Sequence, residues 1–217
     1  MTLSEENYLK AIYSLQIEYP SGVSTNAIAE HLETKPASAT DMIKKLNDKN
    51  LVHYKPYQGV LLNEDGEKHA LKIIRKHRLW ETFLVEKLNF GWDEVHEVAE
   101  ELEHITSEKL IAELDLFLGE PKYDPHGDPI PDSDGKLPET AKLKLSKLKK
   151  GNTGTCIGVN DTSSSFLKYL AKQKIELGTS IEVLHLESFD QSMTIKVDDR
   201  ELLLSHIATE NIYVRKN

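Results

Sequence analysis

The segment STNAIAEHLETKPASATDMIKKLNDK, residues 24–49, decides how the N-terminal part of this chain folds. Ser24 or Thr25 can cap a short helix that ends near Leu32, because a hydroxyl oxygen accepts a hydrogen bond from the free amides of a first helical turn. After a tight turn, Pro36 stands in the first turn of a second helix that reaches about Lys49. Two short helices joined in this way predict a helix-turn-helix motif.

The residues on either side of this motif extend it into a larger unit. Before it, apolar residues at helical spacing predict a helix that is capped by Ser4 and stops near Pro20. After it, β-prone runs around a Pro-Tyr-Gln-Gly turn predict a hairpin, or wing, within residues 51–62. The order helix, helix, helix, hairpin is that of a winged helix-turn-helix domain.

The remainder of the chain predicts more helices, a connector and a small β-domain. Amphipathic helices are expected over residues 64–88, from the capping residue Asp93 to Ile105, and over 107–118. They carry more apolar positions than one small domain needs, which makes them candidates for a dimer interface. Five prolines and three glycines predict an irregular connector over 119–138. A basic, helical-looking stretch at 142–150 precedes short β-like runs, broken by a helix at 166–173 and spaced as in a small barrel: 154–159, 180–186, 192–197, 201–204 and 211–214.

Composition places the chain among globular proteins. Its 217 residues are 39% hydrophobic, which is enough for a packed core. No basic leader precedes an apolar run, and no stretch approaches the roughly 18 apolar residues that a membrane span needs. We therefore expect a cytoplasmic protein whose partners include neither a membrane nor a small organic substrate. The single Cys156 excludes an internal disulfide and a cysteine-based zinc finger.

Charge is distributed unevenly along the chain. The formal net charge is −9. Residues 35–57 nevertheless hold five lysines against two aspartates, a local balance of +3 that suits contact with a polyanion. Residues 81–140 hold seventeen acidic residues against four lysines, a local balance of −13. Such a segment repels itself in the folded state unless cations neutralise part of it.

Histidine and carboxylate side chains are spaced as metal ligands along the acidic segment. On the helix from Asp93, one stripe carries donors at positions i, i+4, i+7 and i+8: His96, Glu100, Glu103 and His104. The preceding helix adds a pair at i, i+4, His77 and Glu81. The glutamates lack lysine or arginine partners on the stripe, so a bridging cation is favoured over a solvated charged face. In the connector, Asp124 and His126 form a weaker pair that is equally consistent with a simple turn. Nitrogen and oxygen donors without thiolates suit manganese, iron(II), cobalt or zinc.

The second helix of the helix-turn-helix predicts contacts to DNA. Its N-terminal end presents small and hydroxyl side chains, and this is the end that approaches base edges in such motifs. Lysines further along the helix would bind phosphates, and a tyrosine at the wing tip would bind a phosphate or sugar. The predicted DNA-binding residues are Thr34, Pro36, Ala37, Ser38, Thr40, Lys44, Lys45 and Tyr57.

Taken together, these motifs resemble the diphtheria-toxin-repressor family of metal-dependent regulators, including its manganese-responsive branch. The resemblance is carried by four segments: Glu6-Asn-Tyr-Leu-Lys-Ala-Ile-Tyr13, Lys76-His-Arg-Leu79 with Glu81, the run from Val95-His96 to Glu103-His104, and Pro125-His-Gly-Asp-Pro-Ile-Pro131. It implies a mainly α fold with β, divided into a winged helix-turn-helix DNA-binding domain (1–63), a helical metal-binding and dimerisation domain (64–140) and an SH3-like, FeoA-type β-barrel (141–217).

The resemblance also assigns roles to the ligand residues. It implies a primary site with Asn7, Glu100, Glu103 and His104, an ancillary set with His77, Glu81 and His96, and a second site with Asp124 and His126. Asp161 is implied as a further ligand from the C-terminal tail. The glutamate at position 100, where the iron-responsive branch has cysteine, favours manganese, with iron(II) next and zinc or cobalt as in vitro substitutes. Asn7 replaces the aspartate usual in manganese sensors and is a weaker ligand.

The expected function is therefore that of a non-enzymatic, metal-dependent repressor. As a homodimer it would bind a palindromic operator of double-stranded DNA and control metal-homeostasis genes, and metal would select the DNA-competent state. Two alternatives stay open at this point. One is a di-iron carboxylate enzyme, because residues 101–104 form a Glu-x-x-His motif and the only other such motif, at 182–185, lies in a β-like run. The other is a winged-helix protein-interaction adaptor with structural metal.

Overall fold

The computed structural model describes residues 1–55, 58–139 and 142–216. These residues form two compact units. The first consists of residues 1–77, 103–106 and 131–136, and the second of residues 78–102, 107–130 and 137–217. The three-domain division expected above, with boundaries at 63/64 and 140/141, stays a prediction. Within the described ranges, no helix combines the length and the apolar character needed to cross a bilayer.

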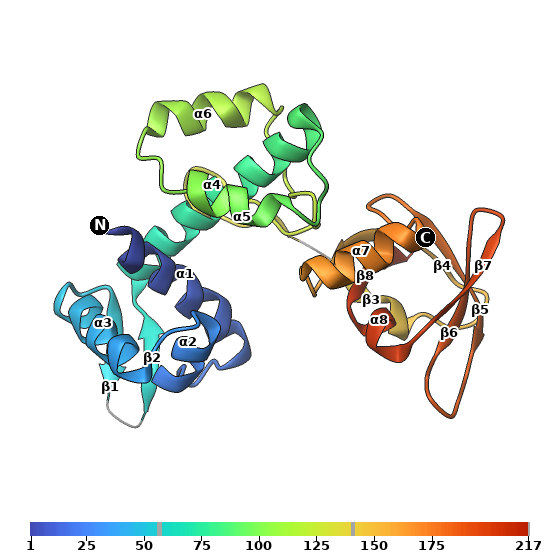
Figure 1. Cartoon of the computed structure of the whole chain (residues 1–217), viewed down its shortest axis with the longest axis horizontal. Helices are drawn as coiled ribbons and strands as arrows, with labels where there is room; N and C mark the ends of the chain where they lie inside the picture. Colours follow the sequence, from blue (N-terminus) through green and yellow to red (C-terminus); the bar gives the residue numbers. More distant parts are fainter. Residues whose placement is uncertain (56–57, 140–141, 217) are drawn as a thin grey trace. The chain divides into compact units, whose positions relative to one another are not determined.

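The first unit is built around three helices and a hairpin (Figure 1). They are α1 (Leu3–Glu18), α2 (Thr25–His31), α3 (Pro36–Asp48), β1 (Val52–Lys55) and β2 (Gly59–Leu62). The strands pair antiparallel with Val52 opposite Leu62, and Val23 adds a single bridge to Val60. The winged helix-turn-helix is confirmed. Its core is formed by side chains that are fully buried, among them Leu9, Ile12, Ile28, Ile43, Leu46 and Val60.

Local capping explains where these helices begin. Ser24 accepts a hydrogen bond from the Ala27 amide and caps α2, and Pro36 opens α3 as predicted. For α1 the predicted cap is wrong by two residues: Thr2 caps the helix, in a capping box with Glu5. Ser4 lies inside the first turn, because only Thr2 has a glutamate three residues later to complete the box.

Helix α4 (Glu64–Leu88) has the predicted bounds and runs from the first unit into the second. In the second unit it is followed by α5 (Val95–Leu102) and α6 (Glu108–Phe117), the latter capped by Ser107. The predicted extent of α5 to Ile105 is wrong. The helix ends at Leu102, so Glu103 and His104 lie in the turn behind it. The connector is irregular, as expected, yet hydrogen-bonded, for example from the Asp124 amide to the Asp128 carbonyl.

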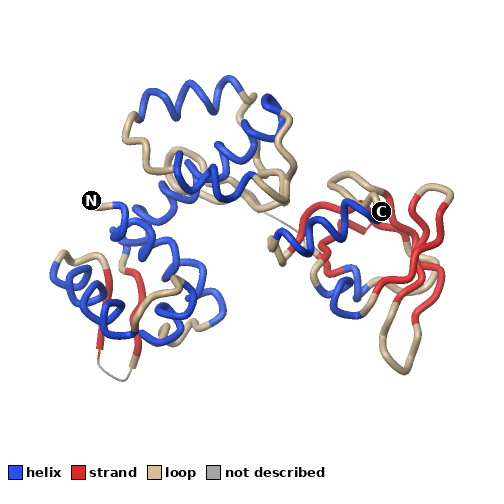
Figure 2. The backbone as a smooth tube through the Cα atoms, in the orientation of Figure 1, coloured by secondary structure: helices blue, strands red, loops and turns tan. Residues whose placement is uncertain are grey.

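The β-domain is a six-stranded antiparallel sheet in the order β3-β8-β4-β5-β6-β7, accompanied by short helices (Figure 2). Its elements are β3 (Leu143–Lys144), a 3-10 turn (Leu145–Lys147), β4 (Thr153–Val159), α7 (Ser164–Gln173), β5 (Ser180–Leu186), β6 (Met193–Val197), β7 (Arg200–Leu204), α8 (His206–Glu210) and β8 (Ile212–Lys216). The helical-looking interpretation of 142–150 is wrong. Leu143 pairs with Val214 in the sheet, while Leu145 and Leu148 are buried in its core. Tertiary packing therefore overrides the local helical preference there.

Candidate functional site

Glu103 lies at the centre of a first cluster of charged and imidazole side chains. Its carboxylate is fully buried, and Lys10 and His77 lie closest to it. Lys10 Nζ of α1 lies 2.7 Å from Oε1 and 2.9 Å from Oε2, and His77 Nδ1 of α4 lies 2.5 Å from Oε2. Burial alone would raise the pKa of the Glu103 carboxyl, but the His77 hydrogen bond and the Lys10 charge outweigh it, so the pKa is lowered. Glu103 is thus held as an ionised carboxylate in a buried place.

His104 completes this cluster and is oriented by α1. Its Nδ1 lies 2.6 Å from Oε2 of Glu6. An ionised carboxylate only accepts, so Nδ1 carries the hydrogen and the lone pair of a neutral ring is left on Nε2. That Nε2 lies 3.8 Å from Oε1 of Glu103. A carboxylate that holds the far nitrogen of an imidazole is the arrangement typical of metal-binding histidines.

Asn7 follows Glu6 in α1. Its Oδ1 is buried and has no hydrogen-bond partner among the described residues. An unsatisfied buried amide oxygen is costly unless a ligand or solvent satisfies it. The first cluster offers an imidazole nitrogen and a carboxylate, and α1 carries this unused amide oxygen; donors of these types fit a divalent ion such as manganese or iron(II).

A second cluster is formed by three buried residues, Glu81, Asp124 and His126. One potential ligand atom from each lies within 4.8 Å of the other two. His126 Nε2 donates to the carbonyl oxygen of Trp92 at 2.7 Å, since a carbonyl can only accept. This leaves His126 Nδ1 3.6 Å from a carboxylate oxygen of Glu81. With Nε2 engaged by the Trp92 carbonyl, Nδ1 is the ring nitrogen that faces Glu81.

The second cluster places acidic and basic side chains together in a buried part of the structure. Burial, followed by the charges of Glu81 and Asp128, raises the pKa of the Asp124 carboxyl. Burial opposes protonation of His126, but its contacts with Glu81 raise its pKa to about 9. Arg78 Nε lies 3.5 Å from Asp124 Oδ2, and the charges of Arg78 and His126 act to lower the pKa of Asp124, so the carboxylates of this cluster already face two basic side chains.

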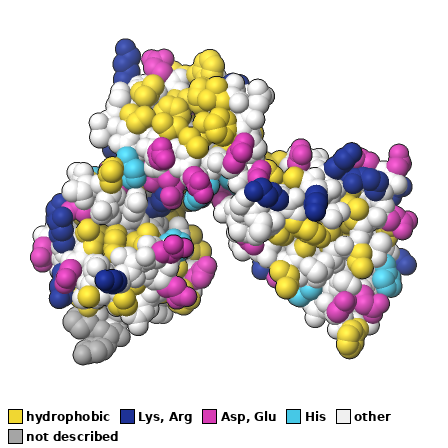
Figure 3. Space-filling model, in the orientation of Figure 1, with side chains coloured by type: hydrophobic (Ala, Val, Ile, Leu, Met, Phe, Trp, Pro, Cys, Tyr) yellow, Lys and Arg dark blue, Asp and Glu magenta, His cyan; other side chains and the backbone are white. Residues whose placement is uncertain are grey.

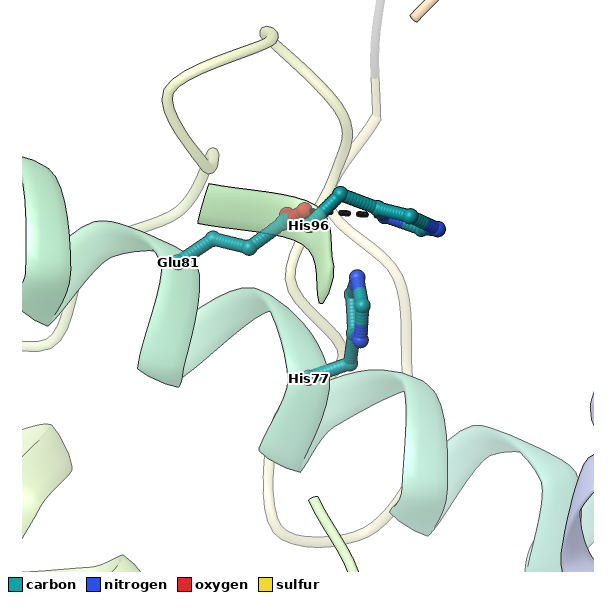
Figure 4. A group of neighbouring side chains, drawn as sticks. All are labelled: His77, Glu81 and His96. Carbon is teal, nitrogen blue, oxygen red and sulfur yellow. Dashed lines mark hydrogen bonds and ion pairs between the residues drawn. The ribbon is translucent and has the colours of Figure 1, made fainter. Parts of the chain in front are cut away.

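The ancillary set of the sequence analysis is also brought together. One ligand atom from each of His77, Glu81 and His96 lies within 4.8 Å of the others (Figure 4). His77 and Glu81 stand one turn apart on α4, and His96 Nδ1 lies 3.4 Å from Glu81 Oε1. Glu100, one turn along α5, lies 3.5 Å from His96 Nε2, and both side chains are about half exposed.

Asp161 does not join either ligand group within the described part of the chain. Its carboxylate accepts a hydrogen bond from the Ser163 amide at 2.8 Å, in the turn before α7. Its role as a ligand stays a prediction.

The predicted DNA-binding residues lie on or just before α3. Pro36, Ala37, Ser38, Lys44 and Lys45 are exposed, and Thr34 and Thr40 are partly buried. Thr34 is hydrogen-bonded to Tyr8, and the Thr40 hydroxyl donates to the Pro36 carbonyl at 2.8 Å. Tyr57 lies outside the described residues. The exposed residues lie at the N-terminal end of α3 and on the side of the helix that carries the two lysines. This is the surface that contacts DNA in helix-turn-helix proteins.

A third ionic group ties α3 to the start of α1. The fully buried Glu5 carboxylate lies 2.9 Å from Lys45 Nζ and 2.7 Å from Lys49 Nζ. The Lys49 hydrogen bond, and then the Thr2 amide, lower the pKa of Glu5 to about 2. Glu5 thus balances two of the lysines that give this region its positive charge, and it holds the recognition helix against α1.

We expect Glu5→Gln to reduce the free energy of unfolding by about 2 kcal/mol near pH 7, the scale of lost charge-assisted hydrogen bonds. Because the folded pKa of Glu5, about 2, lies below its ordinary value of 4.5, this stabilisation is complete above pH 4.5 and disappears as the pH falls towards 2. Urea titrations of both proteins between pH 3 and 7 measure the difference. A difference that stays constant over this range would contradict the assignment.

The structure corrects one argument from the sequence. The acidic stripe was expected to lack cationic partners, but Glu103 is paired with Lys10, and Glu81 contacts His96 and His126. Lys10 and Glu103 are 93 residues apart, so spacing on one helix does not reveal the pair. Sequence reasoning also missed Glu5 and Glu6. Their place beside Asn7 at the start of α1 was the only signal available.

A winged helix-turn-helix that is joined to buried imidazole and carboxylate clusters defines a metal-responsive DNA-binding protein. Comparison with known families agrees with this class. Residues 1–60 match the family described as iron dependent repressor, N-terminal DNA binding domain, and residues 63–132 match its metal binding and dimerisation domain. Residues 143–216 match the FeoA domain.

Similar proteins cover most of the chain. An uncharacterized HTH-type transcriptional regulator of Methanocaldococcus jannaschii is 37% identical over 118 residues, which are 54% of this chain and 94% of that protein. The iron-dependent repressor IdeR of Mycobacterium leprae is 30% identical over 158 residues, 71% of this chain and 68% of that protein. The structure of a manganese-dependent transcriptional repressor in complex with manganese superimposes with a TM-score of 0.85 at 35% identity, covering 98% of this chain and 100% of that one.

The chain belongs to the iron-dependent repressor, or diphtheria-toxin-repressor, family of metal-dependent transcriptional repressors. The family resemblance, the fold class with its FeoA-type β-domain, and the repressor function are thereby confirmed. The family consists of DNA-binding repressors and not of enzymes, so the di-iron enzyme is not supported, and neither is the adaptor.

Proposed function

We propose that this repressor binds a palindromic operator as a homodimer when it is loaded with manganese, or next best iron(II), and that it controls metal-homeostasis genes from the cytoplasm. The observation that carries the proposal is the first cluster. Glu103 and His104 meet α1 there, and Glu5 of α1 holds the recognition helix through Lys45 and Lys49. A metal bound in this cluster would act on the helix that positions the DNA-reading residues.

In this proposal the primary ligands are Asn7, Glu100, Glu103 and His104, and the ancillary ones are His77, Glu81 and His96. Asp124 and His126 would bind a further ion with Glu81, and Asp161 would assist them. A bound divalent ion would neutralise the negative charge of these carboxylates. The chain contributes the nitrogen and oxygen ligands named above. Their lack of thiolates, together with the similarity to a repressor solved with manganese, favours manganese.

Dimerisation is supported by large apolar side chains that are exposed to solvent in the single chain. Leu88 at the end of α4 and three residues of α6 are between 40% and 66% exposed: Leu110, Leu116 and Phe117. Figure 3 shows hydrophobic side chains gathered over this helical part. A patch of this kind on a monomer is typical of a protein interface, and the segment belongs to the matched dimerisation domain. We infer that a second copy of the chain covers it.

The test is selection of DNA from a random-sequence pool by the purified, metal-stripped protein, with manganese, iron(II) under anaerobic conditions, zinc or no metal. We expect a palindromic sequence to be enriched with manganese or iron(II) and not without metal. Sedimentation of the complex should give two chains per palindrome. If no metal increases binding to any selected sequence, the proposed function is wrong.

A further inference from the structure

The ammonium group of Lys10 contacts both oxygens of the Glu103 carboxylate, in the place where a bound cation would lie. Its Nζ lies 2.7 Å and 2.9 Å from the two oxygens of Glu103, so one ammonium group is shared between both. The Lys10 side chain is 19% exposed and that of Glu103 is not exposed at all. Lys10 follows Asn7 by three residues and Glu6 by four, which places all three on one face of α1.

The same carboxylate oxygen faces both the lysine and the candidate metal-binding imidazole. Oε1 of Glu103 is the oxygen 2.7 Å from Lys10 Nζ, and it is also the oxygen 3.8 Å from His104 Nε2. The other oxygen, Oε2, is occupied by His77 Nδ1 at 2.5 Å. An ion shared between His104 and Glu103 would therefore need the oxygen that Lys10 already contacts.

Charge explains why a cation has to be present there. A fully buried carboxylate without a counter-charge is strongly destabilising. His77 also contributes a hydrogen bond and favourable charge to Glu103, but a histidine ring can lose its charge near neutral pH, whereas a lysine side chain keeps it. Among the described residues that contact Glu103, Lys10 is thus the one lysine, and the other two are histidines.

We propose that Lys10 is the internal counter-ion of the metal site: it neutralises Glu103 in the metal-free protein and has to release Oε1 before this oxygen can ligate a divalent ion. Lys10 thereby weakens metal affinity and sets the metal concentration at which the repressor responds. The inference rests on the proposed function, because it takes Glu103 as a ligand. It goes beyond that function by assigning the response threshold to one residue that is itself no ligand.

The test measures binding of manganese alone, by isothermal titration calorimetry of the full chain without DNA. Lys10→Met keeps the length of the side chain and removes the charge. We expect the Kd for manganese to fall by roughly tenfold or more. An opposite charge at hydrogen-bond distance shifts the pKa of a carboxyl by about one unit or more, which corresponds to a tenfold change in cation affinity. The metal-free variant should also melt at a lower temperature than wild type, and manganese should restore most of the loss.

Lys76→Met is the matched control. Lys76 Nζ lies 3.5 Å from the carbonyl of Ile105, two residues after Glu103, so its removal deletes the same charge nearby without touching the carboxylate. Its Kd should stay within about twofold of wild type. Lys10→Arg keeps the cation and should keep the weak affinity. If Lys10→Met does not fold, Lys10→Gln takes its place, because its amide can still donate to Glu103, and it must also bind manganese more tightly.

Two outcomes would overturn the proposal in different ways. An unchanged or weaker affinity of the neutral Lys10 variants would show that Lys10 only supports the site structurally. Equal tightening in Lys76→Met would show a general charge effect. Glu103→Gln in the same titration separates this result from the proposed function. If it leaves manganese binding intact, the metal site itself is misassigned. If it abolishes binding while Lys10→Met has no effect, only the counter-ion role fails.

Discussion

Glu103→Ala is expected to abolish metal-dependent DNA binding while leaving the fold and the weak, metal-independent binding intact. Glu103 is the buried carboxylate around which Lys10, His77 and His104 are arranged. Its removal takes away a group that contacts all three. We expect the manganese-stimulated affinity for the selected operator to fall by at least about 100-fold, because even residues that merely support a ligand change metal affinity by about 10- to 100-fold. Fluorescence anisotropy with labelled operator, with and without manganese, measures the loss.

His104→Ala should have the same effect, since its imidazole is the proposed nitrogen ligand of the primary site. Glu101→Ala is the matched control: Glu101 is exposed on α5, two residues before Glu103, and is not among the proposed ligands. It should bind like wild type. Unchanged manganese dependence in either the Glu103 or the His104 variant would remove the assignment of the primary site. Loss of the metal-independent binding as well would point to misfolding, which circular dichroism detects.

Gly127→Ala should destabilise the second unit by about 3 kcal/mol or more and impair the second cluster. Gly127 follows the candidate ligand His126 and has a φ of +81°, a conformation that side chains with a Cβ rarely adopt. A Cβ there would lie 1.9 Å from the carbonyl oxygen of Ile157 and 2.5 Å from the Cα of Gly158. Both are backbone atoms of β4, and the Val159 amide donates to the His126 carbonyl beside them. The connector and the strand would have to separate.

Gly151→Ala isolates the steric part of this effect. Gly151 has the same φ of +81°, but a Cβ there would meet no atom within 4 Å. Its substitution should cost only about 1 kcal/mol, from the backbone conformation. Thermal unfolding compares the two variants, and calorimetry counts the manganese ions that each binds. Equal destabilisation of both would mean that the close approach of the connector to β4 is absent in solution.

The ion pairs change how the unmetallated state is understood. The sequence alone suggested an acidic stripe that repels itself until metal arrives. In the structure, α1 is already held to the turn after α5, by Lys10 on Glu103 and by Glu6 on His104. Metal would then exchange one set of electrostatic contacts for a stronger one. The free-energy difference between the metal-free and the metal-bound state is then smaller than it would be if the acidic residues simply repelled one another without metal. A single residue can therefore change the response by a larger share of this difference.

Much of the architecture could be predicted from the sequence, because local rules decide it. Helix α4 and strand β5 have the predicted bounds, Glu64–Leu88 and Ser180–Leu186, since the period of apolar residues sets both. The helix-turn-helix followed from Ser24, Pro36 and their spacing. The proximity of His77 and Glu81 could be predicted because residues four positions apart lie one turn apart on the same face of a helix. Each of these features depends on residues within a few positions of one another.

What only the tertiary structure decided is which distant residues meet. Glu103 and His104 leave the predicted stripe because α5 ends at Leu102, an end that no capping residue announces. Their partners Lys10 and Glu6 lie 93 and 98 residues earlier in the chain, and Glu5 reaches Lys49 over 44. An ion pair depends on distance in space, and a sequence records only distance along the chain. The sequence therefore determined a winged-helix repressor with metal ligands, and the fold decided which cation each buried carboxylate meets.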